Sequence, residues 1–472
     1  MADLLAARDA AVTGDMVELR LDGIRHLDVG RALAGRRVPA IVTCRPMWEG
    51  GRFDGSEEER RAILSTALDL GAEFVDVEWQ AVEGRSTGVA LRDLVARAPE
   101  RIVVSSHEFD GVPADLEERV RAMRNTGAGT IKVAVAVDRL SQTLCLGPIA
   151  AEGPAVVIGM GESGVASRLL AGRFGSRWTY AGDGIAPGQL PARRMIDDYG
   201  FRRVTPATRL FGVVSTSALH SLSPVMHNAA FAAAGLDAVY VPLQVRDFTD
   251  FLSFAEGMGI EGASITIPFK LDALKAALPS DGLTQQVGAA NTLRIRDGQW
   301  QATNTDVEGF LHPLSAALGD SLEGARASVL GAGGAARAVI VALASKGARV
   351  TVHARKEEQA RELASLFGVS AGPYPPESGS WDVLVNCTPL GGAALRMQSP
   401  LSAEGLSGRL VYDLTYGPGE STLCRDARLA GLAALDGLAM LVAQAERQFE
   451  WWTGQKPEPG VMEAAARRRL GV

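Results

Sequence analysis

A glycine-rich segment between an apolar run and an alanine-rich run restricts the fold of the second half of the chain. It reads Ser328-Val329-Leu330-Gly331-Ala332-Gly333-Gly334-Ala335-Ala336 and fits the pattern G-x-G-x-x-A. In this pattern the glycines allow a tight strand-to-helix turn, and a pyrophosphate lies against the start of the helix. With a helix expected over Ala335–Lys346, the segment predicts a Rossmann-like unit. The expected cofactor-binding residues are Gly331, Gly333, Gly334, Ala335 and Ala336.

The end of the next expected strand discriminates between the two nicotinamide cofactors. An acidic residue at this position binds the ribose hydroxyls of NAD. This chain instead reads Thr351-Val352-His353-Ala354-Arg355-Lys356. Arg355 and Lys356 suit a 2′-phosphate, so we expect NADP. The alternative is a pair of solvated cations at a helix start.

The composition limits the class of protein. The chain has 472 residues, which corresponds to about three domains. A net charge of −7 argues against nucleic acid as a partner, and no apolar run reaches the ~18 residues of a membrane span. The start of the chain lacks the pattern of a secretion signal. The cysteines form no C-x-x-C pair, so we expect a cytoplasmic protein with reduced thiols and no metal site; they are Cys44, Cys145, Cys387 and Cys424.

Short β-rich runs alternate with helical patterns such as Glu57–Leu70 and Asp115–Asn125 over the first 200 or so residues. This alternation predicts parallel strands in an open sheet or a closed barrel, and seven strands are one short of a (β/α)8 barrel. The expected strands are Met16–Asp22, Pro39–Arg45, Phe74–Trp79, Ile102–His107, Thr130–Val137, Ala155–Met160 and Trp178–Gly182. Proline and glycine punctuation places the main boundary near Thr205–Thr208, and a third unit begins around Ala325.

Polar groups occur at most of the expected strand ends, where the active sites of barrels lie. Lys132 stands inside an apolar strand, a costly position unless the lysine is paired or neutral. We expect burial to lower its pKa and to free the amine for attack on a ketone. His107 ends another strand, and Arg168 follows a third. Taken one at a time, these residues also fit a salt-bridged lysine, a core histidine and a solvated arginine.

The order of these motifs resembles type I 3-dehydroquinate dehydratase over roughly residues 1–200. The motifs are Glu18-x-Arg20-x-Asp22, Cys44-Arg45-x-x-x-Glu49-Gly50-Gly51, Ser106-His107-x-Phe109, Ile131-Lys132-x-Ala134, Ser167-Arg168 and Ala186-Pro187-Gly188-Gln189. The resemblance implies a barrel in which Lys132 forms an imine with the substrate and His107 is the general acid and base. It implies that Arg168 binds the carboxylate. The same resemblance makes Glu18, Arg20, Arg45, Glu49 and Gln189 substrate-binding or orienting residues.

Two departures from that family's pattern bear on the barrel. Ile185 stands where the family usually has a serine, which removes a substrate hydrogen bond worth about 1 kcal/mol or more. The chain also opens with a helical pattern, Asp3–Ala11, where the family has a strand. We therefore expect the first barrel strand to be absent, with Met1 not the natural start, and this leaves open a barrel without full activity.

Several motifs from about Leu210 onward resemble shikimate dehydrogenase. They are Ser221-Leu222-Ser223-Pro224, Ser264-Ile265-Thr266-Ile267-Pro268-Phe269-Lys270, Ala289-Ala290-Asn291-Thr292, Asn304-Thr305-Asp306, Asn386-Cys387-Thr388-Pro389-Leu390-Gly391, Tyr412-Asp413-Leu414-Thr415-Tyr416-Gly417-Pro418 and Asp436-Gly437-Leu438-Ala439-Met440-Leu441. The resemblance implies a catalytic pair, Lys270 and Asp306. It assigns substrate binding to Ser221, Ser223, Thr266, Asn291, Tyr416 and Gln444. It adds Asn386, Thr388 and Gly437 to the cofactor-binding residues.

Together the two resemblances imply a bifunctional enzyme with small-molecule substrates. It would dehydrate 3-dehydroquinate to 3-dehydroshikimate and reduce that product to shikimate with NADPH. The expected domains are a barrel over residues 1–205, a substrate-binding domain over 206–312 with helices from 437–472, and an NADP domain over 313–436. An impaired barrel beside a working dehydrogenase, a metabolite-sensing regulator and a preference for quinate stay open as alternatives. The oligomeric state also stays open.

Overall fold

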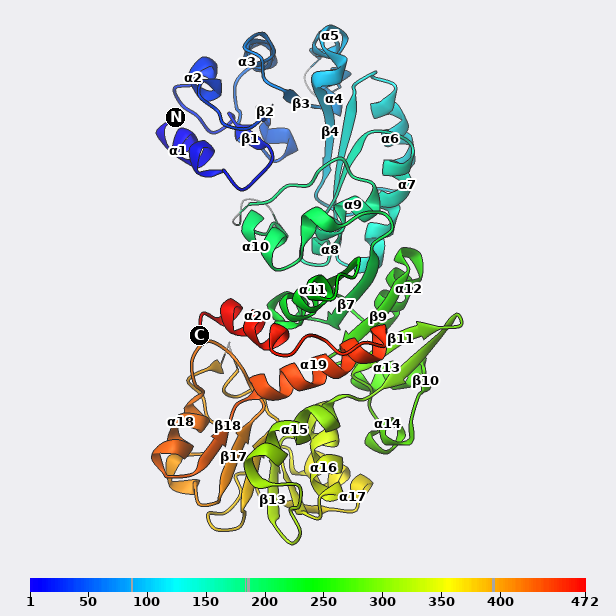
Figure 1. Cartoon of the computed structure of the whole chain (residues 1–472). Helices are drawn as coiled ribbons and strands as arrows, with labels where there is room; N and C mark the ends of the chain where they lie inside the picture. The colour runs from blue at the N-terminus through cyan, green and yellow to red at the C-terminus, as the bar shows by residue number, and fades with distance from the viewer. Residues whose placement is uncertain (86–87, 183, 185–186, 393–394) are drawn as a thin grey trace. The chain divides into compact units, whose positions relative to one another are not determined.

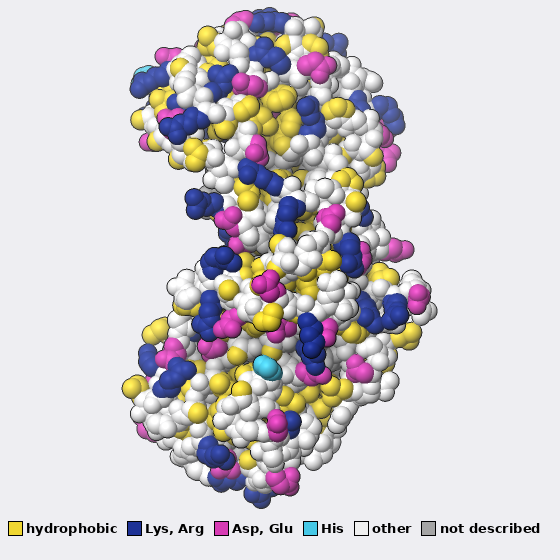
Figure 2. All heavy atoms as spheres, in the orientation of Figure 1, with side chains coloured by type: hydrophobic (Ala, Val, Ile, Leu, Met, Phe, Trp, Pro, Cys, Tyr) yellow, Lys and Arg dark blue, Asp and Glu magenta, His cyan; other side chains and the backbone are white. Residues whose placement is uncertain are grey.

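The computed structural model describes residues 1–472 except 86–87, 183, 185–186 and 393–394. The chain divides into two compact units, Met1–Thr208 and Arg209–Val472 (Figure 1). Charged side chains of both signs are spread over the visible face of each unit (Figure 2). No helix within the described residues has the length and apolar character needed to cross a bilayer.

Six parallel strands form the sheet of the first unit, and they pair in the order in which they follow one another in the sequence. They are β1 (Val17–Arg20), β2 (Ala40–Thr43), β3 (Phe74–Glu78), β4 (Ile102–Glu108), β5 (Thr130–Ala136) and β6 (Ala155–Met160). The helices are α1 (Ala2–Ala10), α2 (Val29–Leu33), α3 (Glu57–Asp69), α4 (Trp79–Val82), α5 (Arg92–Arg97), α6 (Leu116–Arg124), α7 (Leu146–Ala151), α8 (Val165–Leu169), α9 (Ala171–Phe174) and α10 (Ala192–Asp197). Sequential parallel pairing with helical returns is the winding of a (β/α)8-type barrel.

The seventh expected strand, Trp178–Gly182, does not form. Two isolated backbone hydrogen bonds are found at its ends instead of regular strand pairing. Arg177 N–H donates to Ala155 O at 2.9 Å, and Gly182 N–H donates to Leu190 O at 3.0 Å. The side chains of Trp178 and Tyr180 pack against the apolar cluster on β5 and β6. The apolar composition that suggested a strand therefore reflects side-chain burial rather than strand pairing.

A mixed sheet forms the first lobe of the second unit, called here the mixed-sheet lobe. Its strands pair in the order β10-β12-β11-β9-β7-β8, with an antiparallel hairpin of β11 and β12. The strands are β7 (Arg209–Ser215), β8 (Ala238–Gln244), β9 (Ile260–Ile265), β10 (Leu278–Pro279), β11 (Thr292–Arg296) and β12 (Gln299–Thr303). The helices are α11 (Ser223–Ala233), α12 (Phe248–Met258), α13 (Lys270–Ala276) and α14 (Gly282–Val287), followed by the long α15 (Asp306–Leu318).

The second lobe of this unit, the parallel-sheet lobe, has the strand order β15-β14-β13-β16-β17-β18. Counted within the lobe this is the order 3-2-1-4-5-6 of a dinucleotide-binding fold, with its switch point between β13 and β16. The strands are β13 (Arg326–Leu330), β14 (Arg349–His353), β15 (Ser370–Gly372), β16 (Val383–Asn386), β17 (Leu410–Asp413) and β18 (Ala433–Leu435). The helices are α16 (Gly334–Ser345), α17 (Glu357–Phe367) and α18 (Thr422–Leu429). The expected Rossmann-like fold is confirmed.

The last two helices, α19 (Gly437–Thr453) and α20 (Val461–Leu470), return to the mixed-sheet lobe. In Figure 1 these red helices lie against the green elements that start the second unit. Phe449 and Trp452 of α19 pack in one apolar core with Phe211, Phe231 and Tyr240. The mixed-sheet lobe is therefore built from both ends of the second unit.

Candidate active sites

Strand register brings the polar groups of the first unit together. Glu78 of β3 pairs with Ser105 of β4, and Ser105 pairs with Lys132 of β5. Thr43 of β2 pairs in the same way with Asp76 of β3. Because neighbouring parallel strands point paired residues to the same face, these side chains converge on one side of the sheet.

Lys132 lies at the centre of this group and is only 5% exposed. Its Nζ donates to Asp76 Oδ2 at 3.1 Å and lies 3.8 Å from Glu18 Oε1. Burial is the largest single influence on the pKa of Lys132 and lowers it, but the opposing effects of its neighbours, led by the negative charge of Asp76 and including Glu18, together outweigh burial, and the pKa is raised. The expectation of a lowered pKa is therefore wrong, because it considered burial without the buried carboxylate. Before substrate binds, the Lys132 side chain is therefore an ammonium cation. It must lose a proton before its nitrogen can attack a carbonyl group.

Arg45 is buried and holds the carboxylates around Lys132. Its Nη2 lies 2.9 Å from Asp76 Oδ1, and its Nη1 donates to Glu78 Oε1 at 2.8 Å and to Ser105 Oγ at 2.7 Å. These contacts make Arg45 an orienting group that keeps Asp76 directed at Lys132. Asp76, Glu78 and Ser105 were not among the predicted site residues, although the alternation of Asp76 and Glu78 in an apolar strand is a signal for them.

A second buried arginine extends this ion network away from Lys132. Arg60 of α3 is fully buried and contacts both Glu57 and Glu78 through charge-assisted hydrogen bonds. It also donates to the carbonyl oxygen of Cys44 at 3.2 Å. The sequence gives little signal for this network, because Glu57 and Arg60 also fit an ordinary solvated helix start.

His107 and Glu49 are hydrogen-bonded to each other beside this group. His107 Nδ1 lies 2.9 Å from Glu49 Oε1, and the His107 backbone N–H donates to the same oxygen at 3.0 Å. Burial lowers the pKa of His107 well below its ordinary value, so the imidazole is neutral. Burial and then Glu78 raise the pKa of Glu49 to about 9, against the opposing effect of Arg45. A neutral imidazole is the form that can accept a proton from a substrate.

Arg168 of α8 is 2% exposed, and the structure describes no acidic partner for it. Its Nη2 donates to Pro187 O at 3.2 Å, whereas Nε and Nη1 make no hydrogen bond within the described residues. Burial lowers the pKa of Arg168 to about 10. A buried guanidinium with unused donors is suited to bind a carboxylate.

Two further predicted residues of the first unit, Glu18 and Arg20, lie beside this group. Glu18 accepts a hydrogen bond from Thr43 Oγ1 at 2.8 Å, and Arg20 makes two hydrogen bonds to Asp22. Gln189 follows Gly188, at which a Cβ would meet Gly161 O at 2.4 Å. Ile185, the departure noted in the sequence, lies outside the described residues.

In the second unit a cavity of about 520 Å³ lies between residues of the two lobes. Lys270 and Asp306 meet in it through a short ion pair. Asp306 is the first residue of α15, where a negative charge is favoured by the helix dipole. Asn291 Nδ2 donates to Asp306 Oδ1 at 2.8 Å. The structure thus brings together a lysine and a carboxylate in a geometry suited to proton transfer.

A hydrogen-bonded network fixes the Asn291 amide beside this pair. The Thr305 N–H and the Thr292 hydroxyl both donate to Asn291 Oδ1 at 2.8 Å. Gln444 accepts from Asn291 Nδ2 at 3.3 Å. Gln448, one turn further along α19, accepts from Ser264 and donates to Thr292. Gln448 lines the cavity but was not predicted, although its spacing of four residues from Gln444 places both on one helix face.

The other predicted substrate residues also line the cavity. Ser221 Oγ accepts the Ser223 N–H at 3.1 Å, and Ser223 is the first residue of α11 rather than its N-cap. Thr266 N–H donates to Val214 O at 3.2 Å just beyond β9. Tyr416 faces the cavity from the other lobe, and burial raises the pKa of its phenol.

The glycine-rich segment forms a cradle at the switch point of the parallel sheet. Gly331 has a φ of +106°, and a Cβ there would approach Cys387 at 3.2 Å. At Gly333, the N-cap of α16, a Cβ would meet nothing within 4 Å, so the helix start faces open space. A Cβ at Gly334 would lie 3.1 Å from Lys270 Cδ. These residues fit a dinucleotide whose diphosphate lies at the helix start.

The rest of the predicted cofactor residues surround this cradle. Asn386 Nδ2 donates to Leu390 O and to Asp413, and Asn386 Oδ1 accepts from Thr388. Ala335 lines the cavity and Ala336 is fully buried. A Cβ at Gly437 would lie 2.1 Å from Leu414 O, so this position requires glycine. Arg355 and Lys356 are exposed directly after β14.

Three family models match the chain. The model of type I 3-dehydroquinase matches residues 2–206. The model of the shikimate dehydrogenase substrate binding domain matches residues 213–293. The model of the shikimate 5'-dehydrogenase C-terminal domain matches residues 437–467.

One curated relative matches nearly the whole chain, and shikimate dehydrogenases match about half of it. A chloroplastic bifunctional 3-dehydroquinate dehydratase/shikimate dehydrogenase of Arabidopsis thaliana is 33% identical over 93% of this chain and 78% of the relative. A shikimate dehydrogenase (NADP(+)) of Methanocella arvoryzae is 40% identical over 55% of this chain and 99% of the relative. A shikimate 5-dehydrogenase of Thermus thermophilus, solved with NADP(H) and shikimate, is similar with a TM-score of 0.50 and 37% identity over 56% of this chain and all of that one.

Proposed function

The chain belongs to the family of bifunctional 3-dehydroquinate dehydratases/shikimate dehydrogenases, and we propose that each activity is carried by its own unit. The protein is a lyase and an NADP-dependent oxidoreductase of the shikimate pathway. This membership confirms the expected pair of activities and the expected cofactor. We assign the dehydratase to residues 1–205, the dehydrogenase substrate domain to 206–312 with helices from 437–472, and the NADP domain to 313–436.

In the dehydratase unit, neutral His107 takes a proton from the Lys132 ammonium, and the amine attacks the substrate ketone. His107 then returns the proton to the former ketone oxygen, which leaves as water and gives a protonated imine. Arg168 holds the substrate carboxylate, because its buried guanidinium has unused donors. His107 removes the proton α to the imine and returns it to the departing β-hydroxyl, which leaves as water. A second water then hydrolyses the imine and frees Lys132. Glu49 orients His107, while Glu18, Arg20, Arg45 and Gln189 bind the ring hydroxyls or hold these groups in place.

In the dehydrogenase unit, Lys270 donates a proton to the ketone oxygen as that oxygen becomes a hydroxyl. The ion pair with Asp306 holds the lysine side chain in the cavity. Ser221 and Ser223 bind the substrate carboxylate, and Thr266, Asn291, Tyr416 and Gln444 contact the ring. NADPH supplies the hydride when it is bound. The reaction therefore takes one hydride from the cofactor and one proton from the protein.

The cofactor is held at the switch point of the parallel-sheet lobe. Gly331, Gly333 and Gly334, with Ala335 and Ala336 at the start of α16, would hold the diphosphate of the bound cofactor. Arg355 and Lys356 bind the 2′-phosphate, since both cations directly follow β14. Asn386, Thr388 and Gly437 complete the pocket on the side of β16.

The substrates are small molecules, namely 3-dehydroquinate, 3-dehydroshikimate and shikimate. We assign the protein to a reducing compartment such as the cytoplasm, because its four cysteines are free thiols.

The buried Lys132–Asp76 contact beside neutral His107 is the observation that carries the dehydratase assignment. The test is to incubate the full chain with 3-dehydroquinate and NADPH and to follow NADPH loss. We expect steady consumption that Lys132→Ala abolishes and that added 3-dehydroshikimate restores. NADPH loss with 3-dehydroshikimate but not with 3-dehydroquinate would mean that the barrel is inactive. No NADPH loss with either substrate would favour a metabolite-sensing role.

A further inference from the structure

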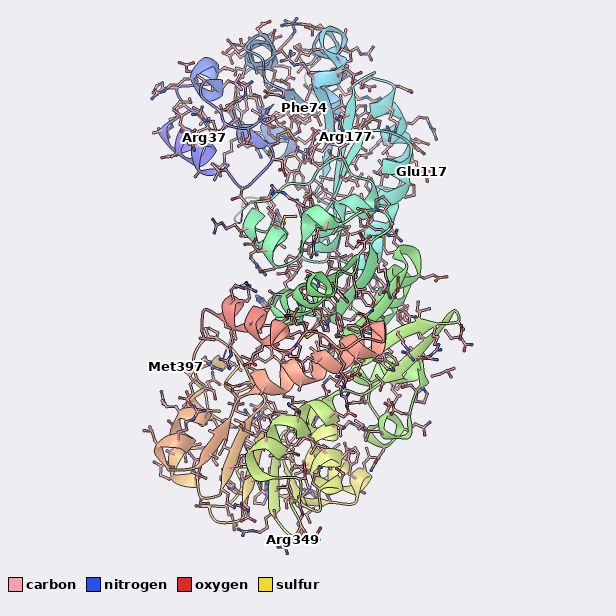
Figure 3. All side chains as sticks on the ribbon, viewed as in Figure 1. Arg37, Phe74, Glu117, Arg177, Arg349 and Met397 are labelled. Atoms are coloured by element: carbon pink, nitrogen blue, oxygen red, sulfur yellow. The ribbon has the colours of Figure 1, made fainter. Side chains whose placement is uncertain are left out.

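The segment that replaces the expected seventh strand brings one aromatic side chain, Tyr180, to the dehydratase site. Arg177 N–H donates to Ala155 O, which ties the segment to the start of β6. Trp178 and Tyr180 then pack against the cluster of Ala134, Val156, Ile158 and Met160. The Trp178 ring lies 5.1 Å from Phe74, and the Arg177 guanidinium covers both rings. Figure 3 labels Phe74 and Arg177 in this part of the first unit.

Tyr180 places the face of its ring against the reactive amine. Lys132 Nζ lies 4.3 Å from the ring centroid, well within the ~6 Å range of a cation–π contact. The Tyr180 hydroxyl is buried, and the Trp178 side chain is the polar neighbour described for it. Burial raises the pKa of Tyr180 to about 12, so the phenol is neutral and its ring keeps a negative face.

The ring has a property that the carboxylate partners of Lys132 lack. An ammonium group has three N–H donors, whereas the protonated imine formed from it has one. Imine formation therefore removes donors that Asp76 and Glu18 could use. A ring face attracts positive charge irrespective of the number of N–H bonds, so its contact with the nitrogen persists after the imine has formed.

We propose that Tyr180 is a positioning residue of the dehydratase, which uses its ring face to hold the Lys132 nitrogen as a cation before and after imine formation. The proposal rests on the assignment of Lys132 as the imine-forming residue. Stabilising the cationic imine favours the state in which the α-proton is acidic. We assign the contribution to the ring, since the face of the ring lies against the Lys132 nitrogen.

The test compares Tyr180→Leu, Tyr180→Phe and a series in which Tyr180 is replaced by mono-, di- and trifluorinated phenylalanine. Fluorination weakens the negative face of the ring with little change in shape, so it separates electrostatics from packing. For Tyr180→Leu we expect kcat for dehydration to fall about tenfold to thirtyfold, equivalent to ~1.4–2 kcal/mol. We expect Tyr180→Phe to keep at least half of the activity. Across the fluorinated series kcat should fall stepwise, with KM for 3-dehydroquinate nearly constant.

Borohydride reduction supplies a second readout, because it fixes the imine on Lys132 as a stable adduct that mass spectrometry detects. The fraction trapped at steady state should fall with fluorination in parallel with kcat. A flat fluorinated series would overturn the proposal, even if Tyr180→Leu fails to fold. Loss of activity in Tyr180→Phe equal to that in Tyr180→Leu would assign the effect to the hydroxyl and also overturn it. Absence of trapping in the wild-type chain would instead refute the role of Lys132, and shikimate dehydrogenase activity measured on the same samples is the internal control.

Discussion

Replacement of Arg168 by methionine should make the dehydratase unit more stable and far less active. Burial lowers the pKa of Arg168 to about 10, from an ordinary arginine value of about 12.5. At ~1.4 kcal/mol for each tenfold change, the folded protein disfavours the charged guanidinium by roughly 3 kcal/mol. The group is charged in both the folded and the unfolded chain at every pH below about 10. The cost is therefore fully present at neutral pH and declines only as the pH rises through that value.

Methionine has similar length and no charge, so Arg168→Met removes this cost. It also removes the hydrogen bond to Pro187 O, worth about 1 kcal/mol. The expected net gain is about 2 kcal/mol, which raises the Tm of a unit of this size by roughly 4–8 °C. The same change removes a charge-assisted contact to the substrate carboxylate. We expect kcat/KM for 3-dehydroquinate to fall about a hundredfold or more, equivalent to ~3 kcal/mol.

Calorimetry of the full chain measures both transitions, and added NADP identifies the transition of the dehydrogenase unit because ligand binding raises its Tm. Arg36→Met is the matched control. Arg36 forms two hydrogen bonds to Glu73 on a half-exposed surface, so its loss should lower stability by up to ~1 kcal/mol and leave activity unchanged. Two results together would refute this reasoning: a lower Tm for Arg168→Met, and a kcat/KM within about threefold of wild type, which corresponds to ~0.7 kcal/mol. Arg168 would then neither destabilise the fold through its burial nor bind the substrate carboxylate.

Four further outcomes are expected. Lys132→Arg keeps a cation beside Asp76 but cannot form an imine, so dehydration and borohydride trapping should both vanish while circular dichroism stays unchanged. Burial lowers the pKa of His107, so the neutral imidazole persists to lower pH. A pH–rate profile of kcat for dehydration should therefore show no inflection at the ordinary histidine pKa of about 6.5. An inflection at that pH would contradict this expectation. Lys270→Met should lower the dehydrogenase kcat about a hundredfold or more, with NADPH affinity, measured by fluorescence titration, unaltered. Arg355→Ser should raise KM for NADPH about tenfold or more and leave KM for NADH unchanged, so equal changes for both cofactors would exclude a 2′-phosphate contact.

The sequence predicted the elements better than the contacts between them. The turn at Gly331 has a local cause, because its φ of +106° and the close approach of Cys387 require glycine. Local rules of this kind can be read from a motif. The strand expected at Trp178–Gly182 failed because apolar composition does not distinguish a paired strand from an extended segment held by its side chains.

The environment of Lys132 shows what a single sequence does not contain. The contact with Asp76 depends on the register of three strands, and register follows from the packing of the whole sheet. Without that partner, burial alone gave the wrong direction for the pKa of Lys132. Arg60 gave no signal for the same reason, since its partner Glu78 lies on another element.

The return of α19 and α20 to the mixed-sheet lobe has a consequence for how the chain acquires its structure during synthesis. Domains generally fold in order as they leave the ribosome, and the parallel-sheet lobe, with β13 to β18, is complete before α19 emerges. The core around Phe211 and Phe231 must wait for Phe449 and Trp452, more than 200 residues later. Until α19 and α20 emerge, the apolar faces of β7 and α11 that pack against them stay exposed to solvent. Nascent chains halted between these points should therefore be the ones that chaperones bind and proteases cut.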